Sequence, residues 1–192
     1  NNHWGWLEES KYKNDMKIIL GDVRDYDSVS KAMQGCKAVF HLAALIGIPY
    51  SYYSPGSYVD TNINGTLNVL QAARDSEVRR VVHTSTSEVY GSARYVPIDE
   101  EHPLNGQSPY AASKIGADQL AMSFYSSFDL PVTIIRPFNT YGPRMLPDDG
   151  RVVSNFIVQA LQGEDITLYG GGEQTRSFCF VDDMIEGITR LM

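Results

Sequence analysis

Residues 80–88, Arg80-Val81-Val82-His83-Thr84-Ser85-Thr86-Ser87-Glu88, decide the fold, because they join a short apolar run to a row of polar side chains. Three further runs of about four to six residues are similarly apolar, as expected of strands covered on both faces. They are Met16–Leu20, Ala38–Leu42 and Val132–Ile135. Longer segments with helical spacing separate these runs. The alternation predicts βαβ units and an α/β fold with a doubly wound parallel sheet.

Two helices are predicted between the strands. One covers Ser57–Arg74, and the other runs from Pro109 to about Ser126 after Ser108 as N-cap. After residue 144 the pattern changes to a turn-rich stretch, and we expect a boundary there, with a main domain over 1–144 and a smaller lobe over 145–192. The elements predicted in this lobe are a helix over Val152–Leu161, a short strand over Ile166–Tyr169 and a last helix from about Val181.

Composition excludes several classes of protein. The 192 residues carry a formal charge of -7, which disfavours nucleic acid or an anionic membrane as the main partner. No apolar run is long enough for a membrane span, and the first residues do not resemble a secretory leader. Two cysteines, Cys36 and Cys179, are too few for a disulfide framework and favour a reduced, cytoplasmic setting. The four histidines lack metal-ligand spacing, so no metal is expected.

The pair Tyr110 and Lys114 suggests acid–base chemistry. Residues four apart share one helix face, so a lysine ammonium can lie beside the tyrosine hydroxyl. A free tyrosine, with a pKa near ~10, is a poor base at neutral pH, and a neighbouring cation favours its phenolate. Such a pair can remove a proton from a sugar hydroxyl while a hydride leaves the same carbon. Taken alone, the pair also fits a surface contact on an amphipathic helix, because Tyr and Lys at this spacing occur by chance.

Three polar groups follow one another along the chain: residues 83–91, the Tyr110–Lys114 pair, and Arg136–Arg144. In this order they resemble the extended short-chain dehydrogenase/reductases that act on nucleotide sugars, the NAD-dependent epimerase/dehydratase family. The resemblance covers essentially the whole chain. It implies a Rossmann-like sheet that binds NAD, with part of a smaller substrate-binding lobe after residue 144.

The resemblance also implies roles for single residues. Tyr110 would take the proton of the sugar 4-hydroxyl, with Lys114 lowering its pKa and Thr86 bonding the same oxygen. Glu88 would remove the C5 proton of the resulting 4-keto sugar, and Ser87 stands where many 4,6-dehydratases have Asp. Residues implied to bind the cofactor are Asp22, Val23, Leu42, Ala43, Ala44, Tyr110, Lys114 and Pro137. Residues implied to bind the substrate are Asn139, Arg144, Val153 and Arg176.

The finer resemblance is divided between two activities. Residues 1–144 resemble UDP-N-acetylglucosamine 4,6-dehydratases, whereas residues 145–192 resemble UDP-glucuronate decarboxylases. Both imply a UDP-sugar substrate, and the half that holds the proton-transfer residues favours dehydration. Decarboxylation and 4-epimerisation, which use the same C4 oxidation, remain alternatives. A non-catalytic module that binds NAD or a sugar nucleotide is a further alternative.

The start of the chain limits these expectations. A doubly wound NAD domain should open with a strand and a glycine-rich turn at the pyrophosphate, and no such run precedes Met16–Leu20. We therefore interpret the 192 residues as an internal portion of a larger enzyme, which the family resemblance expects to be a homodimer. We expect this portion alone to bind NAD weakly and to fold poorly if a sheet edge is bare.

Overall fold

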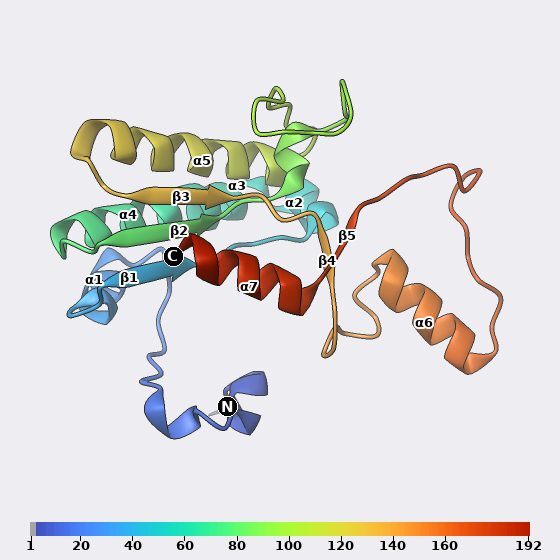
Figure 1. Ribbon diagram of the computed structural model, residues 1–192, viewed down its shortest axis with the longest axis horizontal. Coiled ribbons are helices and arrows are strands. Elements are labelled where there is room, and N and C mark those ends of the chain that lie inside the picture. The colour runs from blue at the N-terminus through green and yellow to red at the C-terminus, as the bar shows by residue number, and fades with distance from the viewer. Residues whose placement is uncertain (1–2) are drawn as a thin grey trace.

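The computed structural model describes residues 3–192 and contains a three-stranded parallel sheet in the order β1-β2-β3 (Figure 1). The strands are β1 (Ala38–His41), β2 (Arg80–Thr84) and β3 (Val132–Ile135). Val81 of β2 pairs with Val39 on one side and with Val132 on the other. The expectation of a parallel α/β fold is confirmed.

Helices connect the strands as parallel pairing requires. After β1 the chain passes through α2 (Ile48–Tyr53), α3 (Pro55–Tyr58), a π-helical turn (Val59–Asn64) and α4 (Gly65–Asp75). The connection from β2 to β3 contains a 3₁₀ turn (Ser87–Tyr90) and then α5 (Pro109–Phe128). Figure 1 shows α4 and α5 lying side by side along the sheet, and they pack against each other. Consecutive right-handed crossovers place such helices on one face of a sheet.

The hydrophobic core lies between this helical layer and the sheet. α1 (Tyr26–Met33) packs on α4 and closes the layer beside β1. The core joins residues of the helices, the central strand and two adjoining loops that are less than a tenth exposed: Met33, Val69, Leu70, Ala72, Ala73, Val78, Val81, Ala121, Phe124 and Leu130. Burial of these side chains is the main force that holds the helices on the sheet.

The predicted helices formed, with one refinement. Ser108 caps α5, since its Oγ accepts a hydrogen bond from the Ala111 amide (3.0 Å). The predicted helix over Ser57–Arg74 is helical throughout but widens into the π turn at Val59–Asn64. Such turns often mark functional positions, and this one carries the buried side chain of Asn62.

Two predicted strands are wrong. Met16–Leu20 is extended but pairs with no strand in residues 3–192, and Leu20 is fully exposed. Ile166–Tyr169 is also unpaired, because Thr167 bonds instead to Gln159 of the helix α6 (Val152–Gln162), at 2.8 and 3.1 Å. An apolar run becomes a strand only when a neighbour satisfies its backbone groups.

Coverage of the sheet is also less complete than predicted. Val81 and Val82 of the central strand are fully buried, but Phe40 of β1 is 44% exposed. The prediction that both faces of every strand are covered is therefore wrong for β1. The reason is that α4 and α5 cover the opposite face of the sheet, and on the Phe40 side the neighbouring Val82 of β2 is covered whereas Phe40 is not.

The segment after β3 holds a second, two-stranded sheet. β4 (Asn139–Tyr141) pairs in parallel with β5 (Phe178–Phe180), and α6 (Val152–Gln162) lies in the long connection between them. The predicted helix from about Val181 is α7 (Val181–Leu191), and its end reaches β2, where Arg80 Nη1 donates to the Leu191 carbonyl (3.2 Å). Among residues 3–192, every helix is too short or too polar to span a bilayer.

Candidate active site at the carboxyl ends of the strands

The 3₁₀ turn after β2 is bound to the end of β3. The Ser87 amide donates to the Pro137 carbonyl (3.2 Å), and the Asn105 amide donates to the Val89 carbonyl (2.8 Å). Within the turn, Thr86 Oγ1 accepts a hydrogen bond from the Glu88 amide (3.2 Å). Thr86 is buried at the base of the turn, whereas the side chain of Glu88 is exposed. The turn thus presents a carboxylate at the carboxyl ends of two neighbouring strands, where open α/β sheets bind their ligands.

The first turns of α5 place Tyr110 and Lys114 at the same edge. Both are buried, Tyr110 being 6% exposed and Lys114 2% exposed. Lys114 Nζ donates a hydrogen bond to the Thr84 carbonyl at the end of β2 (2.7 Å). The structure therefore brings Thr86, Glu88, Tyr110 and Lys114 to one place, although they come from two separate elements.

The pKa values of this pair differ from the expectation that Lys114 alone lowers the pKa of Tyr110. Burial lowers the pKa of Lys114 to about 8, and the charge of Asp118 partly opposes that effect. Burial raises the pKa of Tyr110, a hydrogen bond with Thr86 lowers it, and the charge of Glu88 raises it further. Tyr110 is therefore a neutral phenol at neutral pH in this state. The ammonium of Lys114 is directed to Thr84, so further positive charge is needed to favour the phenolate.

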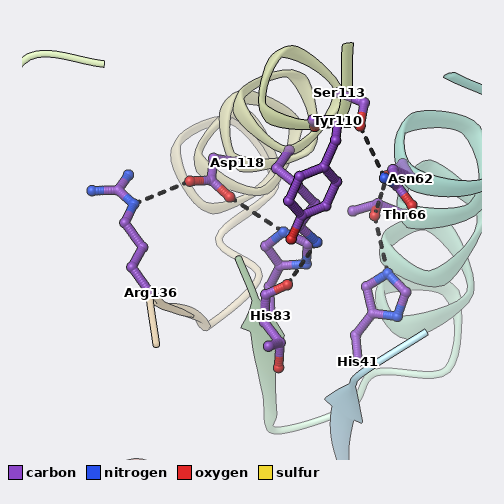
Figure 2. A network of polar contacts seen from close by, with 10 residues as sticks. His41, Asn62, Thr66, His83, Tyr110, Ser113, Asp118 and Arg136 are labelled. Carbon is purple, nitrogen blue, oxygen red and sulfur yellow. Dashed lines mark hydrogen bonds and ion pairs between the residues drawn. The ribbon is translucent and has the colours of Figure 1, made fainter. Parts of the chain in front are cut away.

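Asn62 fixes the loop after β1. Its Oδ1 accepts from the Leu45 amide (2.8 Å), and its Nδ2 donates to the Leu45 carbonyl (3.0 Å) and to Ser113 Oγ of α5 (2.9 Å). Figure 2 shows Asn62 pointing toward Ser113, with the nearby pair of His41 and Thr66 (3.0 Å). The loop is thereby anchored to the helix that carries Tyr110.

The residues expected to bind the cofactor lie just after β1, just after β3 and in the loop before α1. Leu42 and Ala43 are exposed just after β1, Ala44 is half-buried, and Pro137 is half-buried just after β3. Asp22 lines an open hollow with Arg24 and Asp60, and Val23 is half-buried beside it in sequence. The Asp22 carboxylate binds Arg24 side on (3.0 Å to Nε), which lowers the pKa of Asp22 to about 2. An anionic carboxylate beside an open edge fits a ligand that offers hydroxyl donors, as a nucleoside does.

The residues expected to bind the substrate are partly gathered. Val153 and Arg176 line a cavity of about 590 Å³ between α6 and the strand β5. Asn139 lies close to this region because its Nδ2 donates to the Ser177 carbonyl (3.0 Å). Arg144 is placed differently: its guanidinium lies over the Trp6 ring (5.1 Å) and 3.8 Å from a Glu9 carboxylate oxygen.

Sequence reasoning missed several residues of the site. The positive charge of Arg151, at the start of α6, lowers the pKa of Tyr110, and Asp149 holds that guanidinium (3.4 Å). Asp118 was also missed, although its spacing of four from Lys114 on α5 was a visible signal. In the described range, no three His, Cys, Asp or Glu side chains gather so as to hold a metal ion.

Comparison with known proteins agrees with this geometry. The chain is 45% identical to UDP-glucuronic acid decarboxylase 6 of Arabidopsis thaliana, over 94% of this chain and 55% of the relative. It resembles the structure of DesIV, a dTDP-glucose 4,6-dehydratase from Streptomyces venezuelae with NAD bound, at 38% identity and a TM-score of 0.79 over 88% of this chain and 52% of that one. A UDP-N-acetylglucosamine 4-epimerase from Methanobrevibacter ruminantium matches at 32% identity and a TM-score of 0.87, over 95% and 62%.

Fold and site together define a member of the extended short-chain dehydrogenase/reductases that process sugar nucleotides. Residues 2–192 match the family model described as GDP-mannose 4,6 dehydratase, and the chain belongs to that family. The chain spans 55% of the length of UDP-glucuronic acid decarboxylase 6 and 39% of that of UDP-glucuronic acid decarboxylase 4, both of Arabidopsis thaliana.

Proposed function

We propose that the chain forms the catalytic part of an NAD-dependent 4,6-dehydratase that acts on a UDP-hexose through a 4-keto intermediate. One observation supports the choice most directly: the 3₁₀ turn after β2 and the first turn of α5 lie together, so that Thr86 lowers and the charge of Glu88 raises the pKa of Tyr110. In this arrangement Tyr110 can act as the base for the sugar 4-hydroxyl, and Glu88 can act as a second base for the adjacent carbon.

The side chains that would hold the cofactor are the residues after β1, after β3 and before α1 that were described above. Asp22 and Val23 would meet its adenosine half, Leu42 to Ala44 would pass beneath it, and Pro137 would flank the nicotinamide end. Bound NAD supplies a hydride acceptor at C4, a hydride donor in the second half of the reaction and positive charge near Tyr110. That charge is what the buried Tyr110 lacks in this state, because burial holds its pKa above the ordinary value.

The proton transfers can be assigned to side chains of this chain. Tyr110 removes the proton of the 4-hydroxyl as the hydride leaves C4, which yields a ketone, and Thr86 bonds the same oxygen. The ketone acidifies the C5 hydrogen, because the electron pair left on C5 is delocalised as an enolate. Glu88 takes that proton, and the C6 hydroxyl leaves as water. Ser87 is a weak acid, so Glu88 itself returns the proton that the leaving hydroxyl needs.

Decarboxylation of UDP-glucuronate is the second candidate, favoured by the 45% identity to a plant UDP-glucuronic acid decarboxylase. In that reaction the bond from C5 to the carboxyl carbon breaks and its electrons enter the C4 ketone, so no C5 proton is removed first. Glu88 is not needed to remove a C5 proton there, but the decarboxylases that this chain resembles also carry Thr-Ser-Glu, so Thr86-Ser87-Glu88 does not distinguish the two reactions. A 4-epimerase, or a binding module without catalysis, would require neither Glu88 nor elimination.

The deciding experiment is product analysis with two substrates. The native enzyme with NAD is incubated separately with UDP-N-acetylglucosamine and with UDP-glucuronate, and the sugar nucleotides are identified by mass. Loss of water from the first supports the proposal, whereas loss of carbon dioxide from the second establishes the decarboxylase. A change of configuration without loss of mass, detected by proton NMR of the product, indicates an epimerase. If the nicotinamide is not reduced by any UDP-sugar, the chain is a binding module.

The proposal extends to assembly and setting. We propose a homodimer through the long helices, supported by Met122, Tyr125 and Phe128, which leave α5 with apolar side chains about half exposed. Analytical ultracentrifugation of the native enzyme tests this, and a monomer at micromolar concentration refutes it.

Cys36 and Cys179 are free thiols, which supports a cytoplasmic setting.

A further inference from the structure

The third residue on the catalytic face of α5 is a buried carboxylate. Tyr110, Lys114 and Asp118 follow one another at spacings of four, and Asp118 is fully buried. Figure 2 shows Asp118 between Arg136 and His83: its Oδ2 lies 3.2 Å from Arg136 Nε, and its Oδ1 lies 3.3 Å from His83 Nε2. Burying a carboxylate is costly unless it is paired. Burial lowers the pKa of His83 and so disfavours its charged form. Arg136 is therefore the cationic partner of Asp118.

Arg136 has a second contact, which leads back to the candidate active site. Its Nη1 donates to Tyr90 Oη (3.1 Å), and the guanidinium lies 5.2 Å from the centre of the Tyr90 ring. Tyr90 is 3% exposed and is held further by the rings of Phe138 and His102, at 6.4 and 5.4 Å. A planar guanidinium binds Asp118 through Nε and Tyr90 through Nη1, and the single nitrogen of a lysine cannot occupy both of these positions.

Tyr90 is the last residue of the 3₁₀ turn that carries Glu88. The side chain of Glu88 is exposed and makes no hydrogen bond to another side chain within residues 3–192, so its position depends on the backbone of the turn. That backbone is attached at its start by the Ser87 amide and near its end by the Val89 carbonyl. The Arg136–Tyr90 contact is a third attachment, through a side chain at the end of the turn.

We propose that Asp118, Arg136 and Tyr90 form a buried chain of contacts that positions Glu88 for proton removal from C5. The proposal rests on the proposed function and deepens it. α5 then locates both bases, since it carries Tyr110 directly and locates Glu88 through Asp118, Arg136 and Tyr90. The three residues are positioning residues, because the exposed carboxylate of Glu88 and not their own side chains meets the substrate.

Tyr90→Phe tests the proposal, because it removes only the hydroxyl and keeps the packed ring. Tyr95→Phe is the matched control: Tyr95 also contacts the His102 ring (4.8 Å), but its hydroxyl bonds Asp99 in an exposed loop. Two rates are measured in the native enzyme with NAD and the UDP-sugar that it accepts. They are formation of reduced nicotinamide in a single turnover and exchange of the C5 hydrogen with deuterium oxide.

We expect Tyr90→Phe to slow C5 exchange about tenfold, as the loss of a hydrogen bond to a charged group implies, while C4 oxidation stays within about twofold of the wild type. Reduced nicotinamide should then accumulate. Tyr95→Phe should change neither rate. Equal slowing of both rates in Tyr90→Phe, or no slowing of exchange, would overturn the proposal, since a purely structural contact does not distinguish the two steps.

A second variant and a second measurement keep the result independent of activity. Arg136→Lys retains the charge opposite Asp118 but cannot also reach Tyr90, so it should reproduce the split of Tyr90→Phe. Amide hydrogen exchange of residues 87–91, measured without cofactor, should rise several-fold in both variants and not in Tyr95→Phe. Unchanged amide exchange refutes the positioning role even if the wild type processes no UDP-sugar, an outcome that separately refutes the proposed function.

Discussion

Lys114→Met should make the folded protein more stable at neutral pH, although Lys114 is placed in the candidate active site. Burial lowers the pKa of Lys114 from 10.5 to about 8, which corresponds to about 3 kcal/mol of preference for the neutral amine, at about 1.36 kcal/mol per tenfold. Below pH 8 the folded state must nevertheless hold the charged form. Removing the charge recovers that energy, less about 1–2 kcal/mol for the lost hydrogen bond to the Thr84 carbonyl. The net gain at pH 7 is about 1–2 kcal/mol.

The sign of the pH dependence follows from the same shift. The folded pKa lies below the unfolded one, so between about pH 8 and 10.5 the unfolded chain binds more protons, and the stability of the wild type rises with pH. Lys114→Met lacks this gain. The stability advantage of Lys114→Met should therefore fall by about 2 kcal/mol between pH 7 and 9.5, so that it vanishes or reverses.

Urea unfolding followed by circular dichroism at a series of pH values measures both quantities. Lys31→Met, at an exposed position of α1, is the control and should follow the pH dependence of the wild type. A difference between Lys114→Met and the wild type that is the same at every pH would refute the reasoning. It would show that Lys114 titrates alike in the folded and unfolded chains.

Three further predictions concern the site. Tyr110→Phe should lower turnover by about 10²–10⁴-fold while calorimetric binding of the UDP-sugar stays unchanged; full activity would remove Tyr110 as the base. Glu88→Gln should stop C5 exchange in deuterium oxide and still allow reduced nicotinamide to form, and undiminished exchange would contradict its role. Gly91→Ala should lower the melting temperature, since Gly91 has φ +63° and an added Cβ would collide with the Asn105 carbonyl. We expect a loss of at least about 1 kcal/mol, and an unchanged melting temperature would mean that the turn relaxes freely.

Local patterns in the sequence were enough to predict several features of the structure. The helix α5 begins where Ser108 and Pro109 predict, because capping depends on residues that are adjacent in the chain. The strands β1, β2 and β3 were identified from their apolar runs, within one residue at each end. The Tyr110–Lys114 pair was found for the same reason, since a spacing of four on a helix implies proximity.

Two apolar runs were assigned wrongly because strand formation is not a local property. Met16–Leu20 has the composition of a strand, yet residues 3–192 offer it no partner, and so it stays extended and exposed. The pairing of Asn139–Tyr141 with Phe178–Phe180 was not predicted, because these segments are joined only by a long connection. Propensity describes what a strand tolerates, and the neighbouring strand decides whether it forms.

The amino-acid sequence by itself determined the parallel α/β class, the helix that carries Tyr110 and Lys114, and the family. It did so because periodicity, helix caps and the order of motifs can be recognised from the order of residues along the chain. Only the tertiary structure decided that Asp118 and Arg136 join Tyr90 at the end of the Glu88 turn, since they come from α5 and from the segment after β3. It also decided that Lys114 is buried against Thr84 and that burial raises the pKa of Tyr110. These properties depend on desolvation and on contacts between distant segments, which no local pattern records.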